Sequence, residues 1–374
     1  MKVLIAGDYC PSGRVEHLIN REGYASVFGD VQSIIKDSDY SIVNFECPVV
    51  SRQQKTIEKL GPNLKCSPQG AEALQWAGFK CVTLANNHFL DYGPEGVKET
   101  LETVASYGID CVGGGMNLRD ASSILYKEIN GKTLAVINCC EHEFSIATEK
   151  TAGSNPLNPV QQYYSIREAK DKADYVLVIV HGGHEHFQLP SLRMQETYRF
   201  FIDAGADAVV NHHQHCYSGY EVWHGKPIFY GLGNFCFDNP SVQSGIWTEG
   251  YCVSIEFSDN SPAFILHPYK QCTNDFIIKL LDHNAFNDRL EELNAIIATP
   301  VSLQIALEEY YESSSKYYGN IFEPFYNRIY LAAKHRGWLP SFISKKRKLV
   351  ASNFVNCEAH RDKLIWWLNH NNKR

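Results

Sequence analysis

The sequence predicts an α/β fold in which two packed sheets are flanked by helices and followed by a helical appendage. Three observations support this prediction. From Met1 to about Asp110, apolar runs alternate with helical segments, which is the βαβ pattern of a parallel sheet. From about Ser123 the pattern changes to strands joined by tight turns. After about His283 the apolar residues follow helical spacing.

Helix boundaries mark the N-terminal third of the chain. Ser67 is a residue type that caps helices, and Pro68 follows it at the first helical position. Pro94 opens a second helix, which Gly108 closes at its C-terminal end. Because these helices connect successive apolar runs, we expect the strands around them to be parallel.

Two hairpins are expected in the middle of the chain. Asn130-Gly131 lies between two apolar strands and is a strong signal for a two-residue turn. A second hairpin, YEVWHGKPIFYG, follows the segment that contains His213 and His215. The runs YCVSIEF and PAFILHP add two further strands. This part of the chain therefore predicts antiparallel strands.

The chain has 374 residues, which is long for one compact domain. We expect a catalytic domain over 1–282 and a helical extension over 283–374. The extension contains LEELNAIIATPVSLQIALEEYYESSSKYY and EPFYNRIYLAAKHR, both with helical spacing and many aromatic residues.

Composition indicates a soluble globular protein, with 44% hydrophobic residues and a mean hydropathy of −0.28. The first residues run into a strand without a signal peptide, and no apolar stretch reaches the length of a membrane span. The 12 cysteines are scattered and form no CxxC pair, which argues against a structural zinc knuckle and favours a reducing compartment. We therefore expect a cytoplasmic protein.

Charge is distributed unevenly along the chain. From residue 301 onward there are 12 Lys and Arg against 6 Asp and Glu, so this tail carries +6 and the preceding residues carry −13 of the net −7. An acidic body is a poor binder of nucleic acid, so we expect no nucleic-acid partner.

Five separate apolar runs each lead into a residue type that can bind a metal ion. These residues are Asp8 after KVLIAG, Glu46 after YSIVNF, Asn87 and His88 after CVTLAN, His181 after YVLVIV, and His213 and His215 after DAVVNH. Such runs are typical of buried strands, and ligands of α/β proteins bind at the carboxyl ends of strands. The sequence therefore predicts one site built from five strand ends.

Carboxylate, carboxamide and imidazole groups together hold divalent cations such as manganese, iron or zinc without a thiolate. Two such ions roughly 3.5–4 Å apart suit hydrolysis or transfer at phosphorus or a carbonyl. Glu46 is the natural bridge, because a carboxylate has two oxygens. The predicted ligand sets are Asp8, Glu46 and His215 for one ion, and Glu46, Asn87, His181 and His213 for the other. We expect His88 to donate a proton to the leaving group.

Several ordered motifs resemble those of a known family. They are GDYC, NFECP, LANNHFLDYG, HGGHE and AGADAVVNHHQH followed by YGLGNFCFD, and they resemble the poly-gamma-glutamate capsule biosynthesis (CapA-type) family of the calcineurin-like metallophosphoesterase superfamily. The resemblance covers roughly Met1 to Phe257. It implies a four-layer αββα sandwich with a two-metal site at the strand ends. The seven residues above match the superfamily's site positions, although Glu46 stands where many members have aspartate.

Cys10 departs from the superfamily pattern, which usually has histidine two residues after the first aspartate. A thiolate at this position could bind metal. The alternative is a packed or idle cysteine, which leaves the first metal site weaker, exchangeable or open.

Two acidic residues are further catalytic candidates. Glu185 matches the family's acidic position after HxG, where it could orient His181, bind substrate or make a structural hydrogen bond. Asp91 could hold the imidazole of His88 or cap the helix that begins near Pro94.

Four residues are candidate substrate contacts. His184 and His186 flank Glu185, and we expect them to contact substrate or support the ligands rather than bind metal. Asn44 and Asn234 are strand-end amides that could meet the substrate or satisfy backbone groups. Strand alternation predicts that His212 points away from the site.

The tail places Lys345, Lys346, Arg347 and Lys348 beside Trp338, Leu339, Phe342 and Ile343, and Ile365–Trp367 follow. Basic residues beside interfacial aromatic residues suit peripheral contact with an anionic membrane surface or with membrane-bound synthesis machinery. A packed helix with a solvated basic face is the alternative.

Three functions fit these residues. The first is a metal-dependent hydrolase or transferase that acts on a polymer or a phosphorylated small molecule in capsule or surface-polymer synthesis. The second is an assembly factor whose site holds substrate without turnover. The third is metal-dependent amide chemistry on a glutamyl polymer or sugar.

Overall fold

The computed structural model describes residues 1–258, 261–274, 277–321, 323, 325, 327–356 and 360. The chain divides into two units, Met1–Leu303 and Gln304–Arg374. The first unit contains both large sheets.

The first sheet has eight strands. Its order is β16 (Lys279–Leu280), β15 (Ala263–Lys270), β14 (Glu249–Glu256), β1 (Lys2–Cys10), β2 (Tyr40–Phe45), β3 (Cys81–Thr83) and β4 (Asp110–Val112), and β13 (Asn234–Phe237) also pairs with β1. Strands β1 to β4 are parallel, as the βαβ pattern predicted.

The second sheet has six strands. Its order is β11 (Tyr220–Trp223), β12 (Lys226–Phe229), β10 (Ala208–His212), β9 (Tyr175–His181), β7 (Lys132–Cys140) and β6 (Leu125–Ile129). Strands β7, β9, β10 and β12 are parallel, and each edge is an antiparallel hairpin. Two short strands, β5 (Gly114–Gly115) and β8 (Gly153–Ser154), form a separate ribbon.

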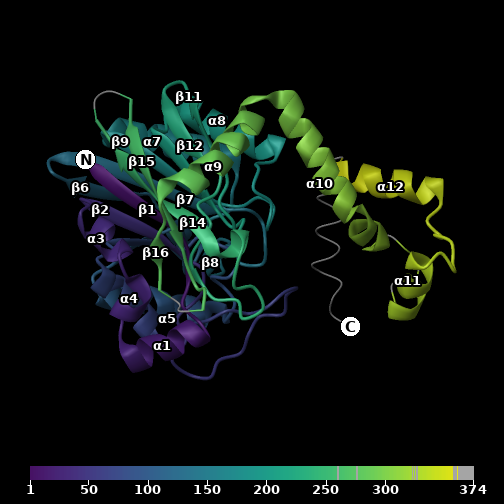
Figure 1. Ribbon diagram of the computed structural model, residues 1–374, viewed down its shortest axis with the longest axis horizontal. Helices are drawn as coiled ribbons and strands as arrows, with labels where there is room; N and C mark the ends of the chain where they lie inside the picture. Colours follow the sequence, from purple (N-terminus) through teal and green to yellow (C-terminus); the bar gives the residue numbers. More distant parts are fainter. Residues whose placement is uncertain are drawn as a thin grey trace. The chain divides into compact units, whose positions relative to one another are not determined.

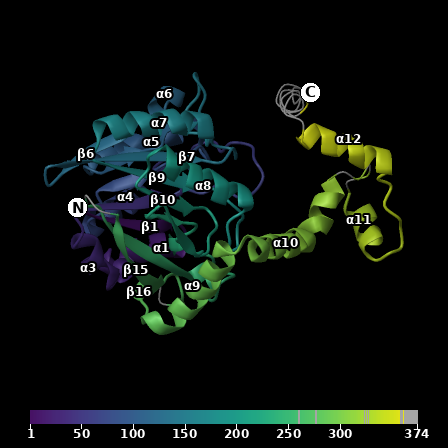
Figure 2. The same cartoon turned by 90° about the horizontal axis from the view of Figure 1, so that it is seen from above.

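Helices cover the outer face of each sheet, which confirms the four-layer αββα arrangement. The first sheet is covered by α1 (Arg14–Glu22), α2 (Ala25–Phe28), α3 (Val31–Lys36), α4 (Pro68–Ala77) and α5 (Gly93–Ser106). The second is covered by α7 (Pro159–Lys172) and α8 (Leu192–Ala204). Figures 1 and 2 show the strands between these two groups of helices. The short helix α6 (Leu118–Ala121) lies beside the β5–β8 ribbon.

Both faces of β1 are buried. Leu4 and Ala6 pack into the cluster formed with the covering helices, and the alternating Val3 and Ile5 are also fully buried. Aromatic rings pack between the sheets, because Phe264 of β15 lies 5.1 Å from Phe229 of β12, measured between ring centroids. Residues buried on both faces explain why these strands are continuous apolar runs rather than alternating ones.

Local signals in the sequence predicted element boundaries well. Ser67 is the N-cap residue of α4, which begins at Pro68. The β6–β7 hairpin turns at Asn130 and Gly131, with φ of 53° and 77°, as expected of a type I′ turn. The second hairpin joins β11 to β12.

The boundary between the units differs from the predicted division at residue 283. Helix α9 (His283–Ala298) belongs to the first unit, because its apolar face packs on the second sheet. Phe286 lies 4.6 Å from the ring of Tyr217, and Asn294 Oδ1 accepts a hydrogen bond from the backbone amide of Tyr220 at 2.7 Å. Helical spacing identified the helix but did not identify the surface that it contacts.

The second unit contains most of α10 (Pro300–Ile321), with α11 (Arg328–His335) and α12 (Lys345–Asn356). Glu323 organises it, because its carboxylate accepts hydrogen bonds from Tyr330 and Ser341 and pairs with Lys334 at 2.7 Å. Burial alone would raise the pKa of Glu323, but the hydrogen bonds from these three residues lower it to about 2.

The basic and aromatic residues of the tail are largely exposed, including Trp338 and Phe342, and the four basic residues begin α12. The predicted Ile365–Trp367 segment lies outside the described residues. Within the described part of the chain, no helix combines the length and apolar character needed to cross a membrane. Peripheral membrane contact through this tail stays a prediction.

Gly7 allows β1 to change partners. Residues Lys2–Ile5 pair with β14, whereas from Asp8 onward the strand pairs with β13. The register against β2 shifts between Ala6 and Asp8. A Cβ atom on Gly7 would lie 1.9 Å from the carbonyl oxygen of Gly233, so only glycine permits this close approach of two backbones.

We predict that Gly7→Ala lowers the free energy of unfolding by about 2–3 kcal/mol, because the backbone of β1 must move away from Gly233. Gly131→Ala, in the turn between β6 and β7, is the control, since a Cβ there meets nothing within 4 Å and only its φ of 77° is unfavourable. This control should cost about 1 kcal/mol. Urea unfolding of both variants measures the difference, and equal losses would contradict the role given to Gly7.

Candidate metal centre

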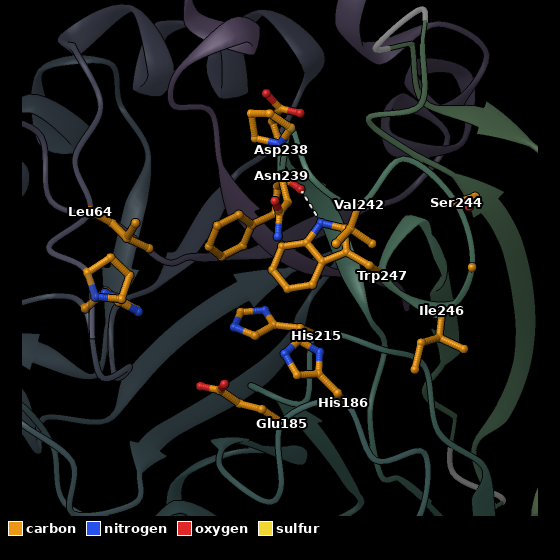
Figure 3. Close-up of a pocket in the computed structure, with 15 residues that line it drawn as sticks. Leu64, Glu185, His186, His215, Asp238, Asn239, Val242, Ser244, Ile246 and Trp247 are labelled. Carbon is orange, nitrogen blue, oxygen red and sulfur yellow. Dashed lines mark hydrogen bonds between the residues drawn. The ribbon is translucent and has the colours of Figure 1, made fainter. Parts of the chain in front are cut away.

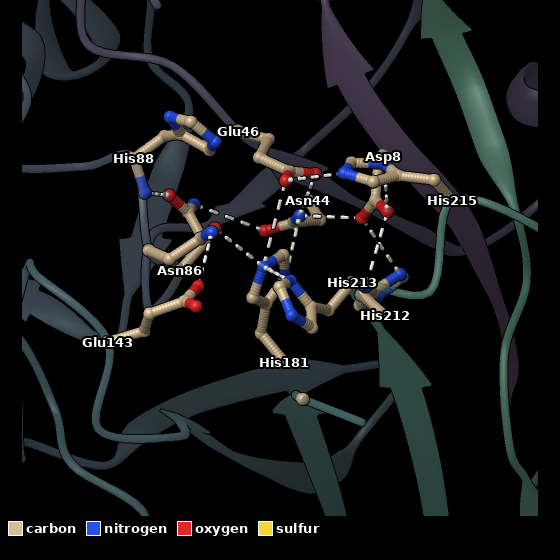
Figure 4. A network of polar contacts seen from close by, with 12 residues as sticks. Asp8, Asn44, Glu46, Asn86, His88, Glu143, His181, His212, His213 and His215 are labelled. Atoms are coloured by element: carbon tan, nitrogen blue, oxygen red, sulfur yellow. Dashed lines mark hydrogen bonds and ion pairs between the residues drawn. The ribbon is translucent and has the colours of Figure 1, made fainter. Parts of the chain in front are cut away.

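The carboxyl ends of four parallel strands meet at one place between the sheets. Strand β1 carries Asp8, β2 leads directly to Glu46, β9 ends at His181, and the loop after β10 carries His213 and His215. All five side chains are buried. Figure 4 shows them converging from the two sheets, as the strand-end pattern predicted.

Five residues form two groups whose ligand atoms lie within 4.8 Å of one another: Glu46, His181 and His213, and Asp8, Glu46 and His215. Glu46 is shared. Its Oε1 atom lies 3.7 Å from His181 Nε2 and 3.6 Å from His215 Nε2. His213 Nδ1 lies 3.1 Å from His181 Nε2. Apart from Asn87, these groups contain the residues of the two ligand sets expected from the sequence, and binding of two ions there stays a prediction.

Asn87 contributes its side-chain oxygen to the group that contains His181. Its Oδ1 atom lies 3.1 Å from His181 Nε2, while its Nδ2 donates a hydrogen bond of 2.7 Å to Glu143 Oε2. Glu143 therefore fixes which end of the amide faces the centre. The hydroxyl of Ser145 donates to the Asn87 carbonyl at 2.7 Å, so the loop after β7 holds both backbone and side chain.

Asn44 lies beneath the centre instead of lining a cavity. Its Nδ2 donates to Asp8 Oδ1 at 2.7 Å and lies 3.4 Å from Glu46 Oε2. Its Oδ1 accepts hydrogen bonds from Thr83 and Asn86, both at 3.3 Å, which fixes the orientation of the amide. The structure thus gives Asn44 the position of a residue that orients the two carboxylates.

Asn234 has a similar position beside His215. Its Oδ1 atom lies 2.9 Å from His215 Nδ1, and its Nδ2 donates to the carbonyl oxygens of His215 and Trp247. This contact directs the other ring nitrogen, Nε2, toward Glu46. Asn234 is fully buried, so of the two roles suggested by the sequence the structure favours contact with backbone groups, together with the orientation of a predicted ligand.

Charge and burial together make the centre suitable for cations. Glu46 Oε1 is buried and has no hydrogen-bond partner. Burial, followed by the nearby Asp8 carboxylate, raises the pKa of Glu46 well above its usual value. Burial lowers the pKa of His181, and lowers that of His215 to about 4, so both imidazoles are neutral near pH 7. Adjacent carboxylates with neutral imidazoles fit divalent metal ions.

The backbone at two predicted ligands is strained. His213 and His215 have φ of 91° and 53°, in the region that favours glycine. Such conformations persist only where surrounding contacts enforce them, and they concentrate at functional sites. Here the backbone amide of His213 donates to Asp8 Oδ2 at 3.2 Å.

His212 does not point away from the centre. Its Nδ1 atom lies 3.5 Å from Asp8 Oδ1, and both of its buried ring nitrogens lack a hydrogen-bond partner. Strand alternation was the wrong guide, because β10 ends at His212 and the backbone turns into a positive φ at His213. Burial lowers the pKa of His212 despite the Asp8 carboxylate.

His88 is held by two charged residues. Its Nδ1 atom lies 2.7 Å from Asp91 Oδ2 and 3.0 Å from Lys59 Nζ, and Lys59 also pairs with the other Asp91 oxygen. Asp91 accepts a hydrogen bond from the Leu64 amide and makes no capping bond to α5, so its contact with His88 is the relevant one. No pattern in the sequence points to Lys59, which comes from an irregular segment far from any motif.

A cavity of about 710 Å³ opens beside the centre (Figure 3). His88, His215, Glu185 and His186 line it, and Glu185 and His186 are exposed. His184 lies outside this cavity and is half-buried, which lowers its pKa. A smaller cavity of about 180 Å³ lies on the other side of the centre. Its lining consists of Asn87, Glu141, His142, Glu143, His181, Gly183 and His213.

Cys10 is packed in the hydrophobic cluster and is fully buried. Its sulfur lies 3.7 Å from Ser12 Oγ, and neither ligand group includes it. This position supports a packed cysteine over a thiolate ligand.

Residues 2–239 match the family model described as bacterial capsule synthesis protein PGA_cap. The chain belongs to this family. Among its relatives, the capsule biosynthesis protein CapA of Bacillus anthracis is 34% identical over 276 residues, which cover 71% of this chain and 66% of the relative. The PGA biosynthesis protein CapA of Bacillus subtilis (strain 168) is 36% identical over 235 residues, covering 62% of each.

About a third of each of these two CapA relatives lies outside the match. A crystal structure of a hypothetical protein from Thermus thermophilus is similar at 16% identity with a TM-score of 0.46, covering 72% of this chain and 99% of that one. The family match confirms the resemblance drawn from the ordered motifs.

We predict that Glu143→Ala weakens binding of one of two manganese ions by about 10–100-fold, because Asn87 loses the partner that orients its amide. Glu143→Gln is the matched control, since its side-chain oxygen still accepts a hydrogen bond from Asn87. Calorimetric titration of the metal-free proteins measures both affinities. Equal weakening in the two variants would show that the charge of Glu143, and not its hydrogen bond, is required.

We predict that His88→Ala lowers turnover about 10²–10⁴-fold while leaving metal content unchanged, because neither ligand group includes His88 and the role expected for it is proton donation. His181→Ala should lose metal as well as activity, since His181 lies in a ligand group. Metal stoichiometry and turnover are measured together for each variant. Equal metal loss in both would make His88 a ligand.

Proposed function

We propose that the protein is a metal-dependent hydrolase with phosphoesterase-type chemistry that acts in capsule or surface-polymer biosynthesis. The supporting observation is the pair of buried residue groups that share Glu46. Divalent manganese, iron or zinc ions bound there supply Lewis acidity and make water a nucleophile at neutral pH. Membership of the capsule synthesis family supports the biosynthetic role.

The protein's own residues divide the work in this proposal. Asp8, Glu46, Asn87, His181, His213 and His215 bind the cations. Asn44, Asn234 and Glu143 orient these ligands through the hydrogen bonds described above. Because Asp91 and Lys59 occupy the Nδ1 side of His88, its Nε2 atom is the one that gives a proton to the leaving group. Glu185 contacts substrate from the cavity wall.

Amide hydrolysis on a glutamyl polymer is a second candidate. The specific observation is the lining of the larger cavity, whose residues are all described and include no lysine or arginine. Phosphate groups are usually recognised by such side chains. A carbonyl at the reacting centre needs less positive charge than a phosphate does, provided that the free carboxylates of the polymer lie outside this cavity.

A non-catalytic assembly role is favoured by a different observation. Cys10 is packed in the core at the position where the superfamily usually has histidine, so one metal site has fewer protein ligands. In that case the centre holds substrate without turnover.

The predicted cytoplasmic location stays a prediction.

Elemental analysis and a screen of phosphomonoesters, phosphodiesters and glutamyl amides test the proposal. We predict that Glu46→Gln lowers both metal content and kcat/KM, the latter by at least about 10²-fold, because one side chain serves both groups. Glu95→Gln, an exposed change in the first turn of α5, is the control. Wild-type protein with bound metal but no turnover of any substrate class would favour the assembly role.

A further inference from the structure

The larger cavity has a chemistry distinct from that of the metal centre that it adjoins. Its walls come from residues of four segments, 62–64, 185–186, 237–242 and 244–247, together with His88 and His215. The apolar residues among them are Pro62, Leu64, Phe237, Pro240, Val242, Ile246 and Trp247. In Figure 3, Leu64 faces Trp247 across the space, and His215 and His186 lie beneath the indole.

Aromatic rings form a rigid wall on one side. The Trp247 ring lies 5.0 Å from that of His215, 5.6 Å from that of His186 and 5.4 Å from that of Phe237. Its indole N–H donates to the Phe237 carbonyl at 3.0 Å, so the polar edge of the indole is already satisfied. The surface left to a ligand is therefore carbon, which packs well against the flat face of another ring.

Charge on the walls opposes an anion. Apart from histidines, the ionisable side chains that line the cavity are Glu185 and Asp238. Asp238 is neutralised by Arg14, which makes two hydrogen bonds of 2.8 and 2.5 Å to its carboxylate. The Glu185 carboxylate, which also lines the space, is not paired with a lysine or arginine among the described residues. A ligand with a carboxylate or phosphate in this cavity would meet that charge and no lysine or arginine among the described lining residues.

We infer that this cavity is a leaving-group subsite for a ring-bearing group without negative charge, such as an uncharged sugar or an aromatic ring. This inference rests on the proposed hydrolase function, because it places the scissile group at the metal centre and the leaving group beside His88. The free carboxylates of an acidic polymer lie outside this subsite.

Binding of phosphonates to the manganese-loaded protein tests the inference without turnover. Phenylphosphonate should bind roughly 10-fold tighter than methylphosphonate, because the ring buries apolar surface against Trp247. 4-Carboxyphenylphosphonate should bind no more tightly than methylphosphonate, because its carboxylate meets the Glu185 carboxylate. Glucosylmethylphosphonate is measured as well. Whichever of the glucosyl and phenyl compounds binds more tightly shows whether the cavity favours a sugar or an aromatic ring. Calorimetry gives each dissociation constant.

Val242→Lys adds a cation to the wall and should tighten 4-carboxyphenylphosphonate about 10-fold. The control is Val222→Lys, at an exposed position of β11 outside the cavity. This variant should bind 4-carboxyphenylphosphonate with unchanged affinity. The inference would be overturned if neither the phenyl nor the glucosyl compound bound more tightly than methylphosphonate, if the carboxylated compound bound as tightly as phenylphosphonate, or if none of them bound. Preferential phenyl binding with no hydrolysis of phenyl phosphate would instead contradict the hydrolase function alone.

Discussion

The buried carboxylate of Glu46 is the constraint around which the first unit is organised. One of its oxygens has no hydrogen-bond partner, although two imidazole nitrogens approach it within 4 Å. An ionised carboxylate without a partner is costly in an interior. The first sheet supplies this acid, and the second sheet supplies both imidazoles. A cation bound between them would offset this cost and link the two sheets, so that the site and the sandwich would stabilise each other.

The two sides of the centre differ in chemistry. One side is the cavity walled by Trp247 and other apolar residues, and the opposite side is a small polar pocket that contains Glu141 and Glu143. Glu141 is paired with Arg193, whereas Glu143 holds Asn87. A substrate bound across the centre would therefore meet unlike surroundings at its two ends. This asymmetry would favour one direction of binding.

Features governed by local chain chemistry could be predicted from the sequence. The backbone geometry at Ser67-Pro68 and at Asn130-Gly131 follows from these residues themselves. The apolar runs before Asp8 and His181 correctly placed both residues at the carboxyl ends of strands. Features that depend on distant contacts could not be predicted. Lys59 contacts His88 although the two residues are 29 positions apart in the sequence, and Glu143 contacts Asn87 although those two are 56 positions apart.

Backbone conformation explains the remaining differences. Alternation failed at His212 because the chain leaves strand geometry at the next residue. Asn44 and Asn234 end strands as expected, but which neighbour each amide contacts depends on both sheets being assembled. The change of partner strand in β1 has a consequence for the folding of this chain during translation, because Asp8 lies in register with Asn234. At roughly 5–20 residues per second, the ribosome completes β13 some tens of seconds after Asp8 emerges. A nascent chain therefore carries Asp8 and Glu46 before its imidazoles, and the full set of candidate ligands exists only once His215 has been made.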